Sequence, residues 1–245
     1  AYLLNRYKKQ IRAAIKNNAP PILSVKMRWE EWANPSYVPP AAKTNGNSVL
    51  PLLKTKWDQA PYYNDSCPYD SKATKRALSG CVATSMSQIM KYWKHPSTGT
   101  GYHAYSDKNF GFLSASFVST TYNWAMMPDN KLTSHNTEIA RLMYHCGVSV
   151  EMKYGVLSSS ANVFADNRPY CAKNAYARFF GYDSLTMQGL LKPDYSDSSW
   201  TTIITNELNS GRPVHYIGYD TTNGGGHGWV CDGYNFTTKN YFHMN

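Results

Sequence analysis

Residues 80–94 read GCVATSMSQIMKYWK, in which a glycine is followed at once by a cysteine and by a stretch that favours an α-helix. Cys81 therefore falls in the first turn of the predicted helix. The first backbone N–H groups of a helix have no partner within it, and the helix dipole is positive at this end. Both effects favour the thiolate, which is the reactive form of a cysteine. The stretch predicts that Cys81 is a nucleophile, provided that the chain supplies a base.

His227 is the best candidate for this base among the seven histidines of the chain. A cysteine nucleophile needs an imidazole that accepts its proton and a third group that orients the ring. The glycines at 224–226 precede His227 and leave the backbone open to an extended substrate. A strand that begins at His227 would hold the ring rigidly. Asn245, one short predicted hairpin downstream, is the predicted orienting residue.

Acyl transfer also requires hydrogen-bond donors for the developing oxyanion. The backbone N–H of Cys81 supplies one donor because it lies at the start of the helix. Gln59, in the segment WDQAPYYN at 57–64, is the predicted second donor. Taken alone, Gln59 is equally compatible with an ordinary surface glutamine.

The histidines and cysteines also have structural interpretations. A histidine at a strand end is commonly part of the packing, and cysteine is among the most buried residue types. Trp229 and Cys231 alternate with His227 on one face of the predicted strand, and both are expected to be core residues. Because residues four apart on a strand share a face without converging on one ion, His227 and Cys231 do not predict a metal site. We therefore expect neither a metal nor another cofactor.

Four of the other six histidines are interpreted from the residues around them. His145 and His215 lie within apolar stretches and are expected to be structural. His95 and His103 lie in polar stretches and are expected to be exposed.

Composition favours a globular, secreted protein. The chain has 245 residues, 42% of them hydrophobic, which is enough for one large domain with a sizeable core. The net charge of +9 is dispersed, and no zinc-finger spacing or RNA-recognition motif accompanies it, so nucleic-acid binding is not expected. Tyrosine and tryptophan are abundant beside small polar residues, a mixture typical of secreted proteins that contain β-structure.

The odd count of five cysteines excludes a complete disulfide framework and leaves at least one free thiol. No apolar run approaches the roughly 18 residues of a membrane span, so none is predicted. The first residues lack the architecture of a signal peptide. Any export signal is expected to have been removed or to lie outside this sequence.

The pattern along the chain predicts an α+β protein. An amphipathic helix is predicted at 1–17 and a linker at 34–47, with a domain boundary near 43–48. Further helices are predicted at 81–94, 136–147, 161–166 and 199–209, and strands at 148–154, 214–219, 227–234 and 240–245. Helices that precede strands in this way predict an N-terminal helical half packed on a C-terminal antiparallel sheet. Ligands in such folds often bind between the two halves.

Four segments together resemble the streptopain-like cysteine peptidases, a family of the papain-like clan. Residues 80–84 with 88–92 resemble the nucleophile segment of the family, and 225–227 with 232–233 resemble its histidine segment. Residues 241–245, YFHMN, resemble its His-x-Asn-Trp segment, cut just before the tryptophan. Gln59 with the residues after it is similar to the oxyanion-hole segment.

The resemblance implies a papain-like fold with the active-site cleft between the two halves. It implies that Cys81 is the nucleophile, His227 the general base and acid, Asn245 the orienting residue and Gln59 an oxyanion donor. Gly80, Gly225 and Gly226 are then expected to contact the substrate.

The resemblance also implies an organisation for the whole chain. Residues 1–47 would be the end of a propeptide with its linker, and 48–245 a catalytic domain whose C-terminal end is incomplete. The protein would be a secreted bacterial endopeptidase that acts on proteins and peptides, with a hydrophobic residue in the second subsite, and its own propeptide would be a partner. The alternatives are a catalytically silent, zymogen-like or degenerate binding protein of the same fold and a Cys-His acyltransferase such as a transglutaminase.

Overall fold

The computed structural model describes residues 47–164, 168–220, 222, 225–237 and 241–245. The chain divides into two units, 1–40 and 41–245, and all the described residues belong to the second. The predicted helix at 1–17 and the predicted linker up to residue 46 lie outside the described residues.

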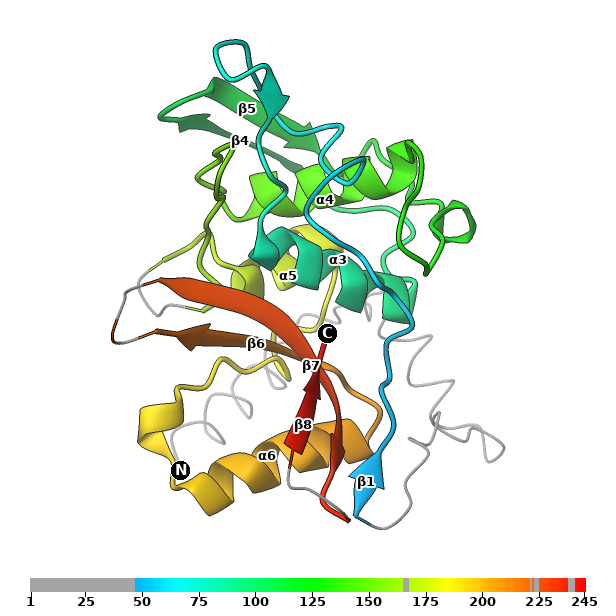
Figure 1. Cartoon of the computed structure of the whole chain (residues 1–245), viewed down its shortest axis with the longest axis vertical. Helices are drawn as coiled ribbons and strands as arrows, with labels where there is room; N and C mark the ends of the chain where they lie inside the picture. Colours follow the sequence, from blue (N-terminus) through cyan, green and yellow to red (C-terminus); the bar gives the residue numbers. More distant parts are fainter. Residues whose placement is uncertain (1–46, 165–167, 221, 223–224, 238–240) are drawn as a thin grey trace, which may run out of the picture. The chain divides into compact units, whose positions relative to one another are not determined.

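Four α-helices lie in the described residues (Figure 1). They are α3 (Cys81–Trp93), α4 (Thr137–Ser149), α5 (Ala172–Phe180) and α6 (Asp197–Asn209), with short 3-10 helices η1 (Trp124–Met126) and η2 (Lys192–Asp194). The predictions for α3, α4 and α6 are confirmed, whereas α5 has no counterpart among them. The helix predicted at 161–166 is wrong for 161–164, which form no helix.

α4 begins where its sequence predicts and ends later. The side-chain oxygen of Asn136 accepts a hydrogen bond of 2.9 Å from the backbone N–H of Ile139, which makes Asn136 the N-cap. Gly147 does not stop the helix, which continues to Ser149. The strand predicted at 148–154 is therefore wrong: its first residues form the last turn of α4. Gly147 instead provides room for the hydroxyl of Tyr154, which a Cβ at this position would meet.

The main sheet is antiparallel and has β7 (Gly226–Asn235) at its centre. β7 pairs with β6 (Val214–Tyr219), with β8 (Tyr241–Met244) and with the short β1 (Ser48–Val49) from the start of the described chain (Figure 1). The strands predicted at the C-terminal end are confirmed. β1 thus ties the beginning of this unit to its last sheet.

Two hydrophobic clusters cover the two faces of this sheet. Alternate residues of a strand point to opposite faces. Val230 belongs to the large cluster that also contains Val82 of α3 and the residues of α4 and α5, whereas Cys231 packs with Ile204 and Leu208 of α6. β7 therefore has an α3 face and an α6 face, and each residue of the strand can be assigned to one of them.

Two small hairpins complete the structure. β2 (Tyr69–Asp70) pairs with β3 (Lys75–Arg76), and β4 (Tyr102–Asp107) pairs with β5 (Gly111–Ser116). The exposure predicted for His103 of β4 is wrong, because the residue is only 8% exposed. Its ring stacks on that of Tyr170 with centroids 4.2 Å apart, and burial lowers the pKa of His103.

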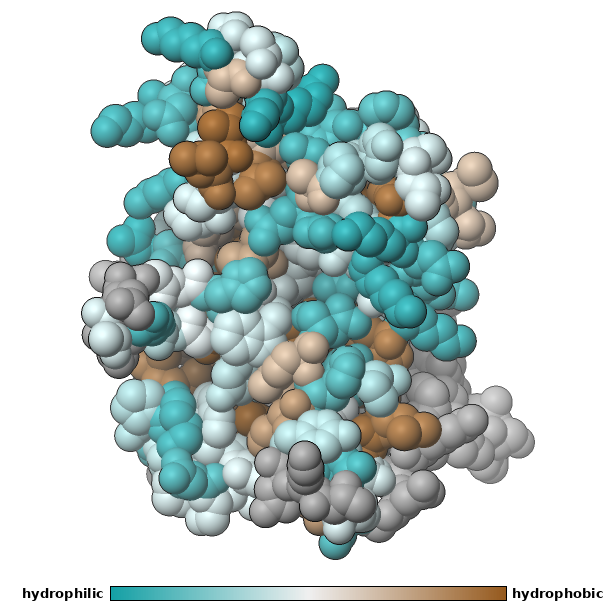
Figure 2. All heavy atoms as spheres, viewed as in Figure 1, coloured by the Kyte–Doolittle hydropathy of each residue, from teal (hydrophilic) through white to brown (hydrophobic). Residues whose placement is uncertain are grey.

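The surface seen in Figure 2 carries hydrophobic residues in separate groups divided by hydrophilic ones. Among the helices of the described residues, none has both the length and the hydrophobicity to cross a membrane. The same part of the chain contains no group of three or more His, Cys, Asp or Glu residues placed to hold a metal ion.

Candidate active site

The start of α3 is shaped by Gly80. Gly80 is the N-cap residue with φ 88° and ψ 142°, a conformation that side chains disfavour. A Cβ there would lie 2.7 Å from Cε of Met152, so the end of the buried Met152 side chain would have to shift to admit one. No side chain caps this end of the helix. The first backbone N–H groups of α3, beginning with that of Cys81, therefore remain available to a ligand.

Cys81 differs from the other four cysteines in its accessibility. It is partly exposed, whereas Cys67, Cys146, Cys171 and Cys231 are each 0% exposed. Burial raises the pKa of Cys67, Cys146 and Cys231 to about 12. All five thiols are free of disulfides. Cys81 is thus the thiol that a reagent or a substrate can reach.

The sequence neighbours His145 and Cys146 belong to the core. His145 Nδ1 lies 2.9 Å from the hydroxyl of Tyr122, and burial lowers the pKa of His145 to about 4. The Ser87 hydroxyl donates to Sγ of Cys146 at 3.5 Å. Both side chains are enclosed by protein, so this pair has no access to a substrate.

The loop that carries Gln59 is attached directly to the segment before Cys81. The backbone N–H of Ser79 donates to the carbonyl oxygen of Gln59 at 3.3 Å, and the Ser79 hydroxyl donates to the same oxygen at 3.2 Å. These bonds bring the backbone of Gln59 to within two residues of Cys81. The structure therefore brings these two predicted site residues into one neighbourhood.

A second segment holds this loop from the other side. The indole N–H of Trp57 donates to the carbonyl oxygen of Pro128 at 2.7 Å. The backbone N–H of Leu132 donates to the Tyr63 hydroxyl at 2.8 Å. Residues 128–132 thereby fix the loop on both sides of Gln59.

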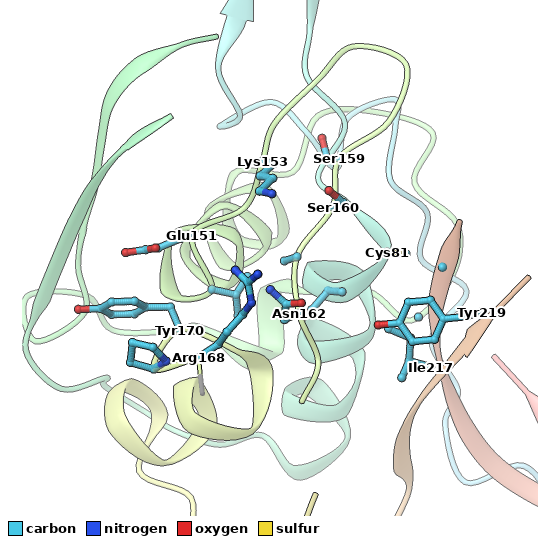
Figure 3. Close-up of a pocket in the computed structure, with 16 residues that line it drawn as sticks. Cys81, Glu151, Lys153, Ser159, Ser160, Asn162, Arg168, Tyr170, Ile217 and Tyr219 are labelled. Atoms are coloured by element: carbon cyan, nitrogen blue, oxygen red, sulfur yellow. The ribbon is translucent and has the colours of Figure 1, made fainter. Parts of the chain in front are cut away.

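A cleft with a volume of about 520 Å³ opens beside Cys81 (Figure 3). One wall consists of Ile217 and Tyr219 of β6 with Gly226 and Gly228 of β7. The other is built from three segments: Val150, Glu151 and Lys153, then Ser159, Ser160, Ala161 and Asn162, and finally Arg168, Pro169 and Tyr170. The three segments of the second wall are largely irregular, so no periodic pattern in the sequence predicts that they line a cleft.

His227 lies on the face of β7 that is turned away from α3. A Cβ on the next residue, Gly228, would lie 3.7 Å from Cγ2 of Val82, so Gly228 faces α3. His227 must then face α6. Consistent with this, its ring centroid is 5.5 Å from that of Trp229, which stacks on Tyr216. Within the described residues, no hydrogen bond joins His227 to Cys81.

Asn245 lies on the other side of β7 from β6, opposite Val230. The two residues exchange backbone hydrogen bonds of 2.8 and 3.0 Å. The side-chain amide of Asn245 donates to the carbonyl oxygen of Thr55 at 2.9 Å. The structure therefore connects Asn245 to the segment before the Gln59 loop and not, by any hydrogen bond between described residues, to His227.

The three glycines predicted to contact a substrate have different surroundings. Gly226 lines the cleft. Gly225 has φ 117°, and a Cβ there would meet no atom within 4 Å. Gly80 is buried and does not line the cleft.

Three comparisons bear on this site. The sequence model described as the Peptidase C10 family matches residues 57–245. Streptopain of Streptococcus pyogenes is 31% identical over 221 residues, which cover 80% of this chain and 53% of streptopain. The active wild-type interpain A cysteine protease of Prevotella intermedia superposes with a TM-score of 0.70 at 32% identity, over 85% of each chain.

A prointerpain A fragment from the same organism superposes with a TM-score of 0.67 at 30% identity, over 96% of this chain and 69% of the fragment. These likenesses confirm the predicted papain-like α+β fold. The chain spans 53% of the length of streptopain and 27% of that of the thiol protease/hemagglutinin PrtT of Porphyromonas gingivalis, to which it is 29% identical.

Proposed function

This chain belongs to the peptidase C10 family of cysteine peptidases, and on this premise we propose that it acts as a cysteine endopeptidase. The observation that carries the proposal is the position of Cys81. It is the most accessible of the five thiols, it lies at the uncapped start of α3, and it lines the cleft.

In the proposed reaction, Sγ of Cys81 attacks the carbonyl carbon of the scissile peptide bond. The backbone N–H of Cys81 and the side-chain amide of Gln59 donate to the resulting oxyanion. The imidazolium of His227 gives its proton to the leaving amine and then, as a base, takes one from the water that hydrolyses the thioester. Asn245 orients the ring of His227. The attachment of Gln59 to Ser79 supports the oxyanion part of this scheme.

The position of His227 supports a latent form of the enzyme. Its side chain must pass from the α6 face of β7 to the α3 face before it can exchange a proton with Cys81. We propose that residues 1–47 are the end of a propeptide, that 48–245 form the catalytic domain, and that the described arrangement is that of a zymogen. The similarity to a prointerpain A fragment over 96% of this chain supports this assignment.

The decisive test is the hydrolysis of an unstructured protein such as casein by the wild type and by Cys81→Ala. We expect hydrolysis by the wild type, after processing if necessary, and none by the variant. Cys171→Ser is the matched control, because it removes a buried thiol at the N-cap of α5, where serine is favoured. Hydrolysis by Cys81→Ala would refute the proposed nucleophile.

Limited proteolysis near residue 47 tests the proposed zymogen. A rise in activity after cleavage is expected, whereas equal activity before and after cleavage contradicts the zymogen. A chain that binds peptides but hydrolyses none under either condition would be the degenerate binding protein considered above. An added primary amine distinguishes hydrolysis from acyl transfer, because a transferase would form the amide product.

We also propose that the protein is exported by a bacterium. The bacterial origin of streptopain and of interpain A supports this. Fractionation of the producing cells should recover the protein in the culture medium, and its retention in the cytoplasm would contradict export.

A further inference from the structure

The cleft beside Cys81 contains three charged residues, Glu151, Lys153 and Arg168. The acidic one is already engaged: Oε1 of Glu151 lies 3.2 Å from Nε2 of His103. Figure 3 shows the Glu151 carboxylate turned away from Lys153 and Arg168. It therefore leaves the charge of the two cations largely uncompensated within the cleft.

Lys153 and Arg168 come from separate segments, and the carbonyl oxygen of Arg168 accepts a hydrogen bond of 3.1 Å from the side-chain amide of Asn174. Lys153 exchanges backbone hydrogen bonds of 2.9 and 3.1 Å with Ser160. Two residues after Arg168, the ring of Tyr170 is stacked on His103 and lies 5.2 Å from the guanidinium carbon of Arg178. In the part of the chain that the structure describes, neither Lys153 nor Arg168 forms an ion pair with a carboxylate.

The side chains of these residues share one part of the cleft. Lys153, Arg168 and Asn162 all line the cleft, and Figure 3 shows them on the side across from Tyr219. Because both cations line one cleft, a carboxylate that enters the cleft is attracted by both. An arginine can also bind a carboxylate through two parallel hydrogen bonds.

We propose that Lys153 and Arg168 form a subsite for the side-chain carboxylate of an aspartate or glutamate close to the scissile bond of the substrate. This inference rests on the proposed peptidase function and specifies its substrate class. The opposite wall, with Ile217 of β6 and with Gly226 and Gly228 of β7, carries no charged side chain and leaves room for the hydrophobic residue that the family resemblance implies. The preferred substrate then carries both kinds of side chain, at different positions.

The test uses pairs of fluorogenic peptides that differ only by Asp against Asn, or Glu against Gln, at each position around the scissile bond. The full chain is assayed before and after any self-processing. At one position we expect kcat/KM to be about tenfold higher for the acid than for the amide. The ratio should fall towards one in Arg168→Gln and in 0.5 M salt, because exposed charges are screened.

Charge reversal provides the sharper result. Lys153→Glu together with Arg168→Gln replaces both cations by one carboxylate and should invert the preference at the same position. Lys75→Gln, on the distant β3, is the matched control and should keep the wild-type ratio. Equal hydrolysis of acid and amide peptides at every position by the wild type would overturn the subsite.

Measurements of peptide binding distinguish a failure of the proposed subsite from a failure of the proposed peptidase function. The affinities of the paired peptides for Cys81→Ala are measured by calorimetry, which requires no turnover. If the wild type hydrolyses nothing, the peptidase function fails, and a tighter binding of the acid peptide still supports the subsite. Equal binding of both peptides to Cys81→Ala rejects the subsite whether or not the wild type is active.

Discussion

The exposure of each cysteine side chain predicts which of the five thiols reacts with a reagent. In the native protein at pH 6, iodoacetamide should modify Cys81 and leave the other four cysteines unlabelled, because these are 0% exposed. Mass spectrometry of the labelled peptides gives the extent at each site. In urea all five should react, which controls for the intrinsic reactivity of the reagent. Native labelling of Cys67 at the rate of Cys81 would contradict the burial described for Cys67.

Replacement of Gly80 even by alanine is predicted to destabilise the protein. Gly80→Ala combines a positive φ of 88° with a Cβ 2.7 Å from the end of Met152, and should lower the free energy of unfolding by about 2 kcal/mol. Urea unfolding measures this loss.

Gly101→Ala is the matched control for the backbone alone, since Gly101 has φ 74° and a Cβ there would meet no atom within 4 Å. It should cost about 1 kcal/mol. Equal losses for the two variants would show that the contact with Met152 does not matter.

The sequence predicts the position of Cys81 at a helix start but not the face of β7 on which His227 lies. Cys81 and Gly80 are local features: a glycine, a thiol and a helix start appear together in the chain. The face on which His227 lies depends on which side of β7 meets α3. The alternation with Trp229 and Cys231 was visible in the sequence, but the identity of the covering helix on each face was not.

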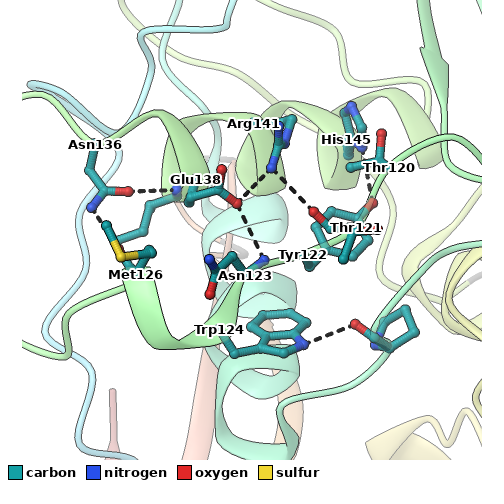
Figure 4. Close-up of polar contacts among 12 residues, drawn as sticks. Thr120, Thr121, Tyr122, Asn123, Trp124, Met126, Asn136, Glu138, Arg141 and His145 are labelled. Atoms are coloured by element: carbon teal, nitrogen blue, oxygen red, sulfur yellow. Dashed lines mark hydrogen bonds and ion pairs between the residues drawn. The ribbon is translucent and has the colours of Figure 1, made fainter.

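The N-cap of helix α4 should contribute measurably to the free energy of unfolding. Asn136 accepts from Ile139 N–H, and its amide donates to the carbonyl oxygen of Met126 at 2.9 Å (Figure 4). Asn136→Ala should lower the free energy of unfolding by about 1 kcal/mol. Asn136→Asp retains the cap acceptor and should lose less. Equal losses in thermal unfolding would assign the effect to the contact with Met126.

Two contacts of residues 128–132, which hold the Gln59 loop, can be compared by mutation. Trp57→Phe removes a buried hydrogen bond to Pro128 and should cost about 2 kcal/mol, together with a several-fold decrease in kcat through loss of order at Gln59. Lys131→Gln breaks the exposed ion pair with Asp58 and should cost less than about 0.5 kcal/mol. Stability and kinetics of both variants check this. A larger effect from Lys131→Gln would contradict the role assigned to Trp57.

The sequence pattern predicts where α4 begins but not where it ends. The helical period and the cap of α4 are local, so its start could be predicted. Its end could not, because Gly147 is required by the packing of Tyr154 and not by a turn. α5 was missed for a similar reason. Its Tyr176, Phe179 and Phe180 are recognisable as core residues only when the surrounding helices and β4 are in place.

For the whole molecule, buried histidines predict a loss of stability in acid. Burial lowers the pKa of His145 from 6.5 to about 4. Above pH 6.5 both the folded and the unfolded chain keep this ring neutral. As the pH falls from 6.5 to 4, the unfolded chain takes up a proton that the folded chain refuses, so the free energy of unfolding falls, by about 3 kcal/mol from this group.

Thermal unfolding between pH 7 and 4 tests this dependence. His145→Gln should show a shallower decrease in melting temperature over this range than the wild type. His135→Gln, at a histidine whose side chain is 78% exposed, is the control and should keep the wild-type slope. Identical slopes for the wild type and His145→Gln would contradict the assignment.

The sheet that separates α3 from α6 limits how His227 can reach Cys81. Sliding β7 by one residue against β6 would turn every side chain of the strand over, including Val230 and Cys231, and would break both hydrophobic clusters. The imidazole can therefore change sides only by rotation of its own peptide units. Gly226 and Gly228 flank it and lack the Cβ atoms that would resist such a rotation. In the zymogen that we propose, activation then requires only a local rotation of the backbone at one end of β7, while the packing on both faces of the sheet is kept.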